Sequence, residues 1–326
     1  MPVLILPTLG PFHILHPRYN AVTVLEMARA WEPRAILLAS YGPAELAAGS
    51  WRDAGDLPLF HLLPWAEANG VEVAALDQQS DLKAQAEQFR EALAQFPKGQ
   101  EILAQASGLE GRLQTLLTRP LLPAEPSSPA FLAELWGYLE GFAGVFGEGP
   151  ATGFREGRMR AVAEKIRALG EGRWVVLADL LDYPYLLREL PGAVGPQEHA
   201  SSPAEADRAI LDRAWRLEEK DDWGLLLQQL QEVGTEEAQY LAAQVYLAAG
   251  QPEDALALME PLLHADFVHP AYLPGYVLAR YGQLQDLVGN RPAALKAYQA
   301  ALALSWAPAE AREIALAGQR TPFKLC

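Results

Sequence analysis

Cysteine is nearly absent from this chain of 326 residues, in which Cys326 is the only one. A disulfide framework and a cluster of metal-binding thiolates are therefore both excluded. Long apolar runs are also missing: the first run, residues 3–6, ends at Pro7, whereas a membrane-spanning helix needs about 20 apolar residues. We expect a soluble, cytoplasmic protein without a membrane segment.

Positive charge is scarce as well. The 26 Lys and Arg residues face 41 Asp and Glu residues, which gives a net charge of −15 and a pI near 4.9. Because a protein must neutralise phosphate charges to bind nucleic acid or anionic lipid, we expect neither as a partner. Arg outnumbers Lys 20 to 6 and only three Asn occur, a bias typical of GC-rich genomes and of thermophiles.

Three common signatures of catalysis are missing from the sequence. It holds no G-x-G-x-x-G and no G-x-x-x-x-G-K-[ST], so the glycine-rich loops that bind dinucleotides and nucleotide phosphates are absent. No serine stands in a G-x-S-x-G setting, the usual place of the α/β-hydrolase nucleophile. The sequence therefore does not indicate an enzyme.

The chain is long enough for two hydrophobic cores, since half of its residues are hydrophobic and 21% are charged. Residues 1–195 alternate short apolar runs with helical patterns, as expected for an α/β domain. Residues 196–203 are rich in turn-forming residues and predict a linker. Residues 204–326 have helical patterns throughout. The predicted fold is an α/β domain followed by an all-α domain of helical repeats.

Four apolar runs in the α/β domain have the length of strands. Because they do not alternate with polar residues, helices should cover both faces of a mostly parallel sheet. Between the third and fourth runs, residues from about 80 to 147 contain three helical patterns and predict a helical insertion, a feature that often builds a ligand pocket. The predicted strands are residues 3–6, 35–39, 71–76 and 174–178.

Two stretches of the second domain repeat each other 39 residues apart: residues 249–256 are AGQPEDAL and residues 288–295 are VGNRPAAL. Helical patterns flank each stretch, so each predicts the turn of an antiparallel helix pair. The predicted helices of the domain are residues 205–219, 223–233, 240–249, 252–263, 276–288, 292–304 and 309–317.

The spacing of small and aromatic residues in these pairs resembles the tetratricopeptide repeat (TPR) family. Gly250 and Ala255 recur as Gly289 and Ala294, and such small residues let two helices approach closely. The resemblance implies an array that binds a protein or peptide on its concave face. The side chains expected to contact that partner are Gln239, Tyr246, Tyr276, Arg280 and Tyr281.

Other interpretations of the repeats also fit the sequence. Their spacing of 39 residues exceeds the 34 of the family, so residues 265–274 must form an added loop, and a plain helical bundle produces similar turns by chance. Alternatively, the repeats form a homo-oligomer or brace the α/β domain. In the bracing case, side chains of the protein itself would fill the concave face.

Two histidines follow the first predicted strand. Loops at the carboxyl ends of parallel strands are where α/β proteins bind ligands, which places His13 and His16 favourably. Their H-x-x-H spacing suits a shared metal ion, although no further motif completes the ligand set. The structural alternative is that one imidazole is hydrogen-bonded within the loop and the other is packed.

The order of motifs in the α/β domain resembles the TraB/ChaN/erythromycin-esterase group, which includes hydrolases and haem- or metal-associated proteins. Residues 10–13 (GPFH) and residues 158–166 (RMRAVAEKI) carry this resemblance, with His13 and Arg158 at the matching positions. It implies a divalent metal or haem at this site and a metal-dependent hydrolase as the alternative to a scaffold.

Several positions depart from the pattern of that group. Pro11 replaces a Thr or Glu, Ser40 stands at the end of the second strand in place of an acid, and residues 180–182 replace a late histidine. A metal-assisted hydrolase needs ligands and a base near the activated water. The resemblance therefore implies a domain that kept the scaffold and lost the catalysis.

Carboxylates follow the third and fourth predicted strands and are further candidates. Asp77, Asp179 and Asp182 could join the histidines and Arg158 in one pocket with acid–base or metal chemistry. Alternatively, Asp77 caps a helix near Ser80 and Asp182 caps the next helix. Arg158, expected near the start of its helix, would favour an anion there, or it is a solvated surface arginine. The candidate pocket residues are His13, His16, Arg158, Asp179 and Asp182.

Overall fold

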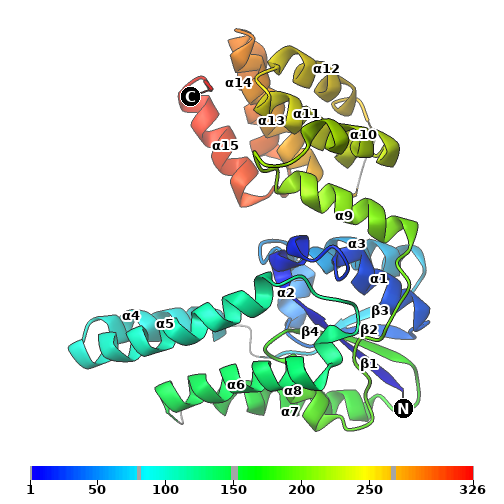
Figure 1. Cartoon of the computed structure of the whole chain (residues 1–326), viewed down its shortest axis with the longest axis vertical. Helices are drawn as coiled ribbons and strands as arrows, with labels where there is room; N and C mark the ends of the chain where they lie inside the picture. The colour runs from blue at the N-terminus through cyan, green and yellow to red at the C-terminus, as the bar shows by residue number, and fades with distance from the viewer. Residues whose placement is uncertain (1, 79–81, 148–152, 266–268, 326) are drawn as a thin grey trace. The chain divides into compact units, whose positions relative to one another are not determined.

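The computed structural model describes residues 2–78, 82–147, 153–265 and 269–325. The chain divides into two compact units, Met1–Glu205 and Ala206–Cys326, and the helix α9 (Pro203–Trp215) runs across their boundary (Figure 1). None of the helices in the described ranges combines the length and the apolar composition that a bilayer crossing requires.

A parallel sheet forms the centre of the first unit, as the sequence predicts. Its order in the described part of the chain is β1-β4-β2-β3. The last strand in sequence, β4, lies between β1 and β2, so that Trp174 is in register with Val3 on one side and with Ala35 on the other. The strands are β1 (Val3–Thr8), β2 (Ala35–Leu38), β3 (Glu72–Ala75) and β4 (Trp174–Asp179).

Helices cover both faces of the sheet (Figure 1). The helices α1 (Ala21–Ala30) and α3 (Leu57–Ala68) lie on one face, while α7 (Gly153–Ala168) and α8 (Tyr183–Glu189) lie on the other. From β1 through β2 to β3 the chain crosses the sheet in one direction, and it then returns to place β4 between β1 and β2. Because crossovers between parallel strands are right-handed, the return places α7 on the opposite face from α1 and α3.

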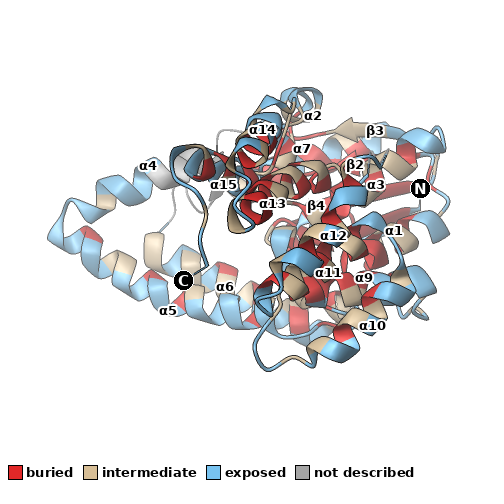
Figure 2. Cartoon of the chain, turned by 90° about the horizontal axis from the view of Figure 1, so that it is seen from above, coloured by how far each residue is buried: buried red, intermediate tan, exposed pale blue. Residues whose placement is uncertain are grey.

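The layer between the sheet and α7 is a continuous apolar core. Ile5 and Val176 of the sheet belong to one buried cluster with Met159, Val162 and Ile166 of α7. Burying such a side chain stabilises the fold by roughly 1.5–3 kcal/mol. The buried residues of β1, β2 and β4 are visible in Figure 2, whereas β3 at the edge of the sheet is less buried. Covering on both faces explains why the strands are continuous apolar runs.

The segment between β3 and β4 contains long helices in addition to α7. The helices α4 (Leu82–Ala94) and α5 (Pro97–Thr118) pack against each other, and α5 also packs against α6 (Pro129–Phe146). Much of α5 is exposed (Figure 2). The first unit also contains α2 (Pro43–Ala48) and the short 3₁₀ segments η1 (Gly10–Leu15), η2 (Ser50–Arg52) and η3 (Glu125–Ser127).

The second unit consists of helices in the residues that the structure describes. Each helix from α10 to α15 packs against the next one in sequence. Their bounds are α10 (Trp223–Val233), α11 (Glu236–Ala248), α12 (Pro252–Leu262), α13 (Leu273–Leu287), α14 (Arg291–Ala303) and α15 (Ala309–Arg320).

The turns of the pairs α11–α12 and α13–α14 have the same backbone structure. The N–H of Gln251 donates to the carbonyl of Tyr246 at 2.9 Å, and 39 residues later the N–H of Asn290 donates to the carbonyl of Gln285 at 2.8 Å. Both turns need a glycine, because their φ angles are 74° at Gly250 and 78° at Gly289. The sequence echo therefore corresponds to a repeated local structure.

A buried tyrosine lies between three helices at the end of this unit. The ring of Tyr298 on α14 is fully buried and contacts Gly282 on α13 and Gly318 on α15 so closely that a Cβ atom at either glycine would overlap it. Its hydroxyl donates to Asp286 Oδ2 at 2.9 Å. Glycine at both positions is therefore a packing requirement of α13, α14 and α15.

Replacing Gly282 by alanine should destabilise the protein by about 1–3 kcal/mol, because the added methyl group overlaps the ring of Tyr298. Gly224→Ala on α10 is the matched control, since its Cβ would meet only Asp222 Oδ1 at 3.5 Å. Without a clash, alanine in a helix gains roughly 0.5–1 kcal/mol over glycine. Urea unfolding followed by circular dichroism measures both variants. Equal stability of the two would contradict this account of Gly282.

Candidate functional site

The carboxyl ends of the strands form one edge of the first unit, because all strands of the sheet are parallel. The neighbouring strands β1 and β4 are followed by helices on opposite faces of the sheet, and α/β proteins bind ligands at such a position of the strand order. The polar residues that follow the strands meet here. They are Ser40 after β2, Asp77 after β3, and Asp179 and Asp182 at and after β4.

Asp182 is the centre of the polar contacts. Its side chain is 1% exposed and makes an ion pair with Arg155 Nη1 at 2.5 Å and with Arg158 Nη2 at 2.6 Å. The hydroxyl of Ser40 also donates to it, at 2.7 Å. The interpretation of Asp182 as a helix cap is wrong: it precedes α8 but makes no capping hydrogen bond, because its carboxylate is used by these three side chains.

Arg158 connects two strands that are not neighbours in the sheet. Besides its contact with Asp182 after β4, its Nε lies 2.9 Å from Oδ2 of Asp77, which follows β3. The strand β2 runs between them, and its following residue Ser40 accepts a hydrogen bond from the N–H of Asp179 at 2.9 Å. The described part of α7 begins at Gly153, so Arg158 lies in its second turn and not at its start as the sequence suggested.

Asp179 lies at the rim of this cluster. Its side chain is 54% exposed, and it lies 3.6 Å from Arg155 Nη1. The pKa of this carboxyl is raised, because neighbouring groups remove part of its hydration and the negative charge of Asp182 lies close to it, while Arg155 lowers the pKa. Two guanidinium groups thus face three carboxylates here. The ion pairs hold the sheet edge together and leave Asp179 as the carboxylate that solvent reaches.

A second buried carboxyl, Asp56, lies at the same edge of the sheet. It precedes α3, is 4% exposed, and its Oδ2 accepts hydrogen bonds from Thr8 Oγ1 and Tyr41 Oη, both at 3.2 Å. Its Oδ1 has no hydrogen-bond partner among the described residues. Burial raises the pKa of Asp56 to about 7, although the two hydrogen bonds oppose this shift. Sequence reasoning missed Asp56, because an Asp before a helix is an ordinary cap pattern.

The two histidines make bonds of a different kind. His13 is fully buried in η1; its Nε2 accepts from the N–H of Leu9 at 2.9 Å, and its Nδ1 donates to the carbonyl of Tyr19 at 2.8 Å. Burial lowers the pKa of His13 to about 3, so the ring is neutral. His16 Nδ1 accepts from the N–H of Leu121 at 3.2 Å. Both residues connect backbone segments.

These bonds do not suit a metal ion or haem iron at His13. A ligating imidazole needs one free nitrogen lone pair. The Leu9 N–H already occupies that of Nε2, while Nδ1 carries the proton. Within the described ranges, no group of three or more His, Cys, Asp or Glu side chains has an arrangement that could hold a metal. The structure thus joins Arg158, Asp179 and Asp182, whereas the histidines take no part in their contacts.

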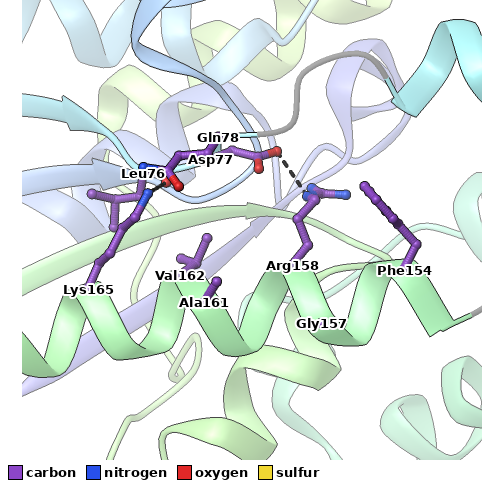
Figure 3. Close-up of a pocket in the computed structure, with 9 residues that line it drawn as sticks. All are labelled: Leu76, Asp77, Gln78, Phe154, Gly157, Arg158, Ala161, Val162 and Lys165. Atoms are coloured by element: carbon purple, nitrogen blue, oxygen red, sulfur yellow. Dashed lines mark hydrogen bonds and ion pairs between the residues drawn. The ribbon is translucent and has the colours of Figure 1, made fainter.

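A pocket with a volume of about 220 Å³ opens beside Arg158 (Figure 3). It lies between α7 and the residues that follow β3. At one end, Arg158 pairs with Asp77, and at the other, Lys165 Nζ donates to the carbonyl of Leu76 at 2.5 Å. The lining residues are Leu76, Asp77, Gln78, Phe154, Gly157, Arg158, Ala161, Val162 and Lys165.

In the second unit, three of the five predicted partner-binding residues are engaged within the unit. Gln239 donates to the carbonyl of Leu258 at 2.8 Å. Tyr276 donates to Glu310 Oε2 at 3.2 Å, and Arg280 donates to Gln283 Oε1 at 2.5 Å. The remaining two, Tyr246 and Tyr281, are half-buried.

The helix α9 packs against the first helices of both equivalent pairs. The ring of Trp215 lies 5.3 Å from Tyr240 on α11 and 5.0 Å from Tyr276 on α13. Its Nε1 donates to Glu237 Oε1 at 2.6 Å, and Arg208 Nη1 binds the same carboxylate at 3.0 Å. A side chain of the protein itself therefore covers the surface at Tyr276.

The carboxyl of Asp56 should make stability fall as pH rises. Its pKa is 3.8 in the unfolded chain and about 7 when folded, so the folded state holds the proton more tightly, and stability decreases between about pH 4 and 7. The full effect is roughly 4 kcal/mol. Asp56→Asn should therefore be more stable than the parent at pH 8 but not at pH 4, as measured by urea unfolding.

Glu67→Gln, an exposed change on α3, is the control for Asp56→Asn and should leave the pH dependence unchanged. An Asp56→Asn variant that loses stability between pH 4 and 8 as steeply as the parent would disprove the assignment to Asp56.

Arg158→Met should destabilise the protein by about 3–5 kcal/mol, because it leaves the buried carboxylates of Asp77 and Asp182 without their shared cation. The matched control is Arg160→Met in the same helix, whose side chain is 55% exposed and whose ion pairs contribute about 1 kcal/mol or less. Equal losses in the two variants, by thermal or urea unfolding, would refute the role given to Arg158.

Comparisons with protein-family models, with curated proteins and with solved structures find no match for this chain. The likenesses to the TPR family and to the TraB/ChaN/erythromycin-esterase group therefore stay predictions. Any proposal about function therefore has to rest on the contacts that this chain's own residues make.

Proposed function

We propose that this protein is a non-catalytic interaction protein whose helical unit binds a partner protein or peptide, in the manner of a TPR array. The observation that carries the proposal is the repeated turn. Gly250 and Gly289 have the same backbone conformation and the same surrounding hydrogen bonds 39 residues apart. Stacked equivalent helix pairs form extended surfaces that commonly serve as binding sites.

The polar residues of the first unit support a scaffold rather than an enzyme. The carboxylate of Asp182 is taken up by two arginines and a serine, and the His13 ring binds backbone groups through both nitrogens. A general base or a metal ligand must instead offer a lone pair to the reacting group. This argues against the alternative of a metal-dependent hydrolase at His13.

The partner contacts proposed here centre on Tyr246 and Tyr281, because Gln239, Tyr276 and Arg280 are engaged within the unit. Tyr281 on α13 lines a groove of about 420 Å³ together with residues of α12 and of the segment after it. Half-buried aromatic side chains in a groove are common anchors of binding. The carboxylate of Glu260 in the same groove and the net charge of −15 favour a basic partner segment. The other lining residues are Ala257, Pro261, Leu263 and His264.

The experiment compares the proteins that co-purify with the intact chain and with a Tyr246→Ser, Tyr281→Ser double variant. We expect at least one partner to bind the intact chain and to be lost from the double variant, with affinity reduced about tenfold or more for each anchor removed. Leu225→Ser is the matched control, since Leu225 on α10 is 51% exposed in the same unit.

Identical partners for the intact chain and the double variant would exclude this surface as the binding site. Recovery of a second copy of the chain as the lost partner would show instead that the repeats form a homo-oligomer. Light scattering on the purified chain distinguishes the two results.

A further inference from the structure

One helix face and one loop enclose the pocket of the first unit. The α7 residues that line it, from Phe154 through Arg158 and Ala161 to Lys165, recur every three or four positions and so lie on one face of the helix. The residues opposite them follow the carboxyl end of β3 (Figure 3). The pocket therefore occupies the part of an α/β fold where ligands usually bind.

The two cations of the pocket differ in their charge balance. Arg158 is paired with Asp77 and with Asp182. Lys165 Nζ binds a neutral carbonyl, that of Leu76, and no described carboxylate oxygen lies within the 4.0 Å of an ion pair. An ammonium has three donors, so two of them are available for a ligand. The positive charge of Lys165 therefore faces the pocket without a described carboxylate to balance it. This is unexpected in a chain with 41 acidic and only 26 basic residues.

The remaining lining selects the body of the ligand. Between Lys165 and Arg158 the α7 side contributes Ala161 and Val162, and Leu76 and Phe154 add further apolar surface. A volume of about 220 Å³ is below the ~300–1,000 Å³ of pockets for drug-sized ligands, which restricts the ligand to a small molecule.

The charge of the pocket distinguishes between anions. Arg158 is already paired with the carboxylates of Asp77 and Asp182, so the ligand has to balance only the single positive charge of Lys165, which one carboxylate does. A phosphate group carries about −1.5 to −2 at neutral pH and would leave excess negative charge beside Asp77.

We propose that this pocket binds a small monocarboxylate with a short aliphatic or aromatic body. Lys165 holds the carboxylate, and the apolar side chains of Leu76, Phe154 and Val162 contact the body. The contacts of Arg158 with Asp77 and Asp182 fix α7 against the ends of β3 and β4, so the pocket exists before the ligand enters. Such preorganisation lowers the entropic cost of binding.

Titration calorimetry on the full chain tests the proposal with isovalerate and benzoate as monocarboxylates. Isovaleramide is the uncharged match of isovalerate, and inorganic phosphate is the competing anion. We expect at least one of the two carboxylates to bind, with the amide and phosphate weaker by about tenfold or more, as expected for loss of a charge-assisted hydrogen bond.

Two variants locate the site. Lys165→Met should weaken binding of the carboxylate by about tenfold or more, whereas Lys296→Met, an exposed lysine on α14, should leave it unchanged. Ala161→Phe keeps Lys165 but fills the pocket and should also abolish binding. This second variant decides the question if Lys165→Met fails to fold, which circular dichroism reveals.

Three results would overturn the proposal: no binding of either carboxylate to the intact chain, phosphate binding as tightly as the carboxylates, or unchanged binding in the folded pocket variants. The partner-binding test of the helical unit is independent of all three, because it changes residues of the other unit.

Discussion

The ion pairs of Arg158 hold the carboxyl edge of the first unit together. The strands β3 and β4 are separated by β2, so backbone hydrogen bonds cannot join their ends directly. The guanidinium of Arg158 joins the two strand ends through side chains instead, because it contacts both Asp77 and Asp182. Taking three charged groups out of water is costly, and only their close mutual contacts offset that cost. The same contacts fix the position of α7, on which one wall of the pocket depends.

Most of the structural features that could be predicted from the sequence depend on residues that are close together in the chain. The apolar runs identified the strands of the sheet and its covering on both faces, because that information lies in consecutive residues. The echo around Gly250 and Gly289 identified two turns, because a φ near +75° requires glycine. Asp179 and Asp182 were candidates because they lie past the fourth predicted strand, at the edge where parallel strands end, whereas Arg158 was a candidate through the resemblance of its helix to the TraB/ChaN/erythromycin-esterase group.

The remaining features depend on contacts between residues far apart in the chain. The strand order, with β4 inserted between β1 and β2, decides that Asp182 meets Ser40 and Arg158 instead of capping α8. Asp56 gains its environment from Thr8 and Tyr41, which no spacing rule connects to it. The sequence shows Lys165 only as a basic residue on a helix, because its place in the pocket depends on the loop after β3 that lies opposite it. Tertiary packing alone supplies this information.

The ring of Tyr298 bears on how the helical unit could have grown. Repeat proteins lengthen when a copied helix pair stacks on the last one. Here Gly282 and Gly318 enclose the ring from both sides, which dedicates α15 to covering the pair before it. Another helix could take the place of α15 on this ring only if it presented its own glycine there. One aromatic side chain and two missing β-carbons therefore restrict which helices can pack at this position.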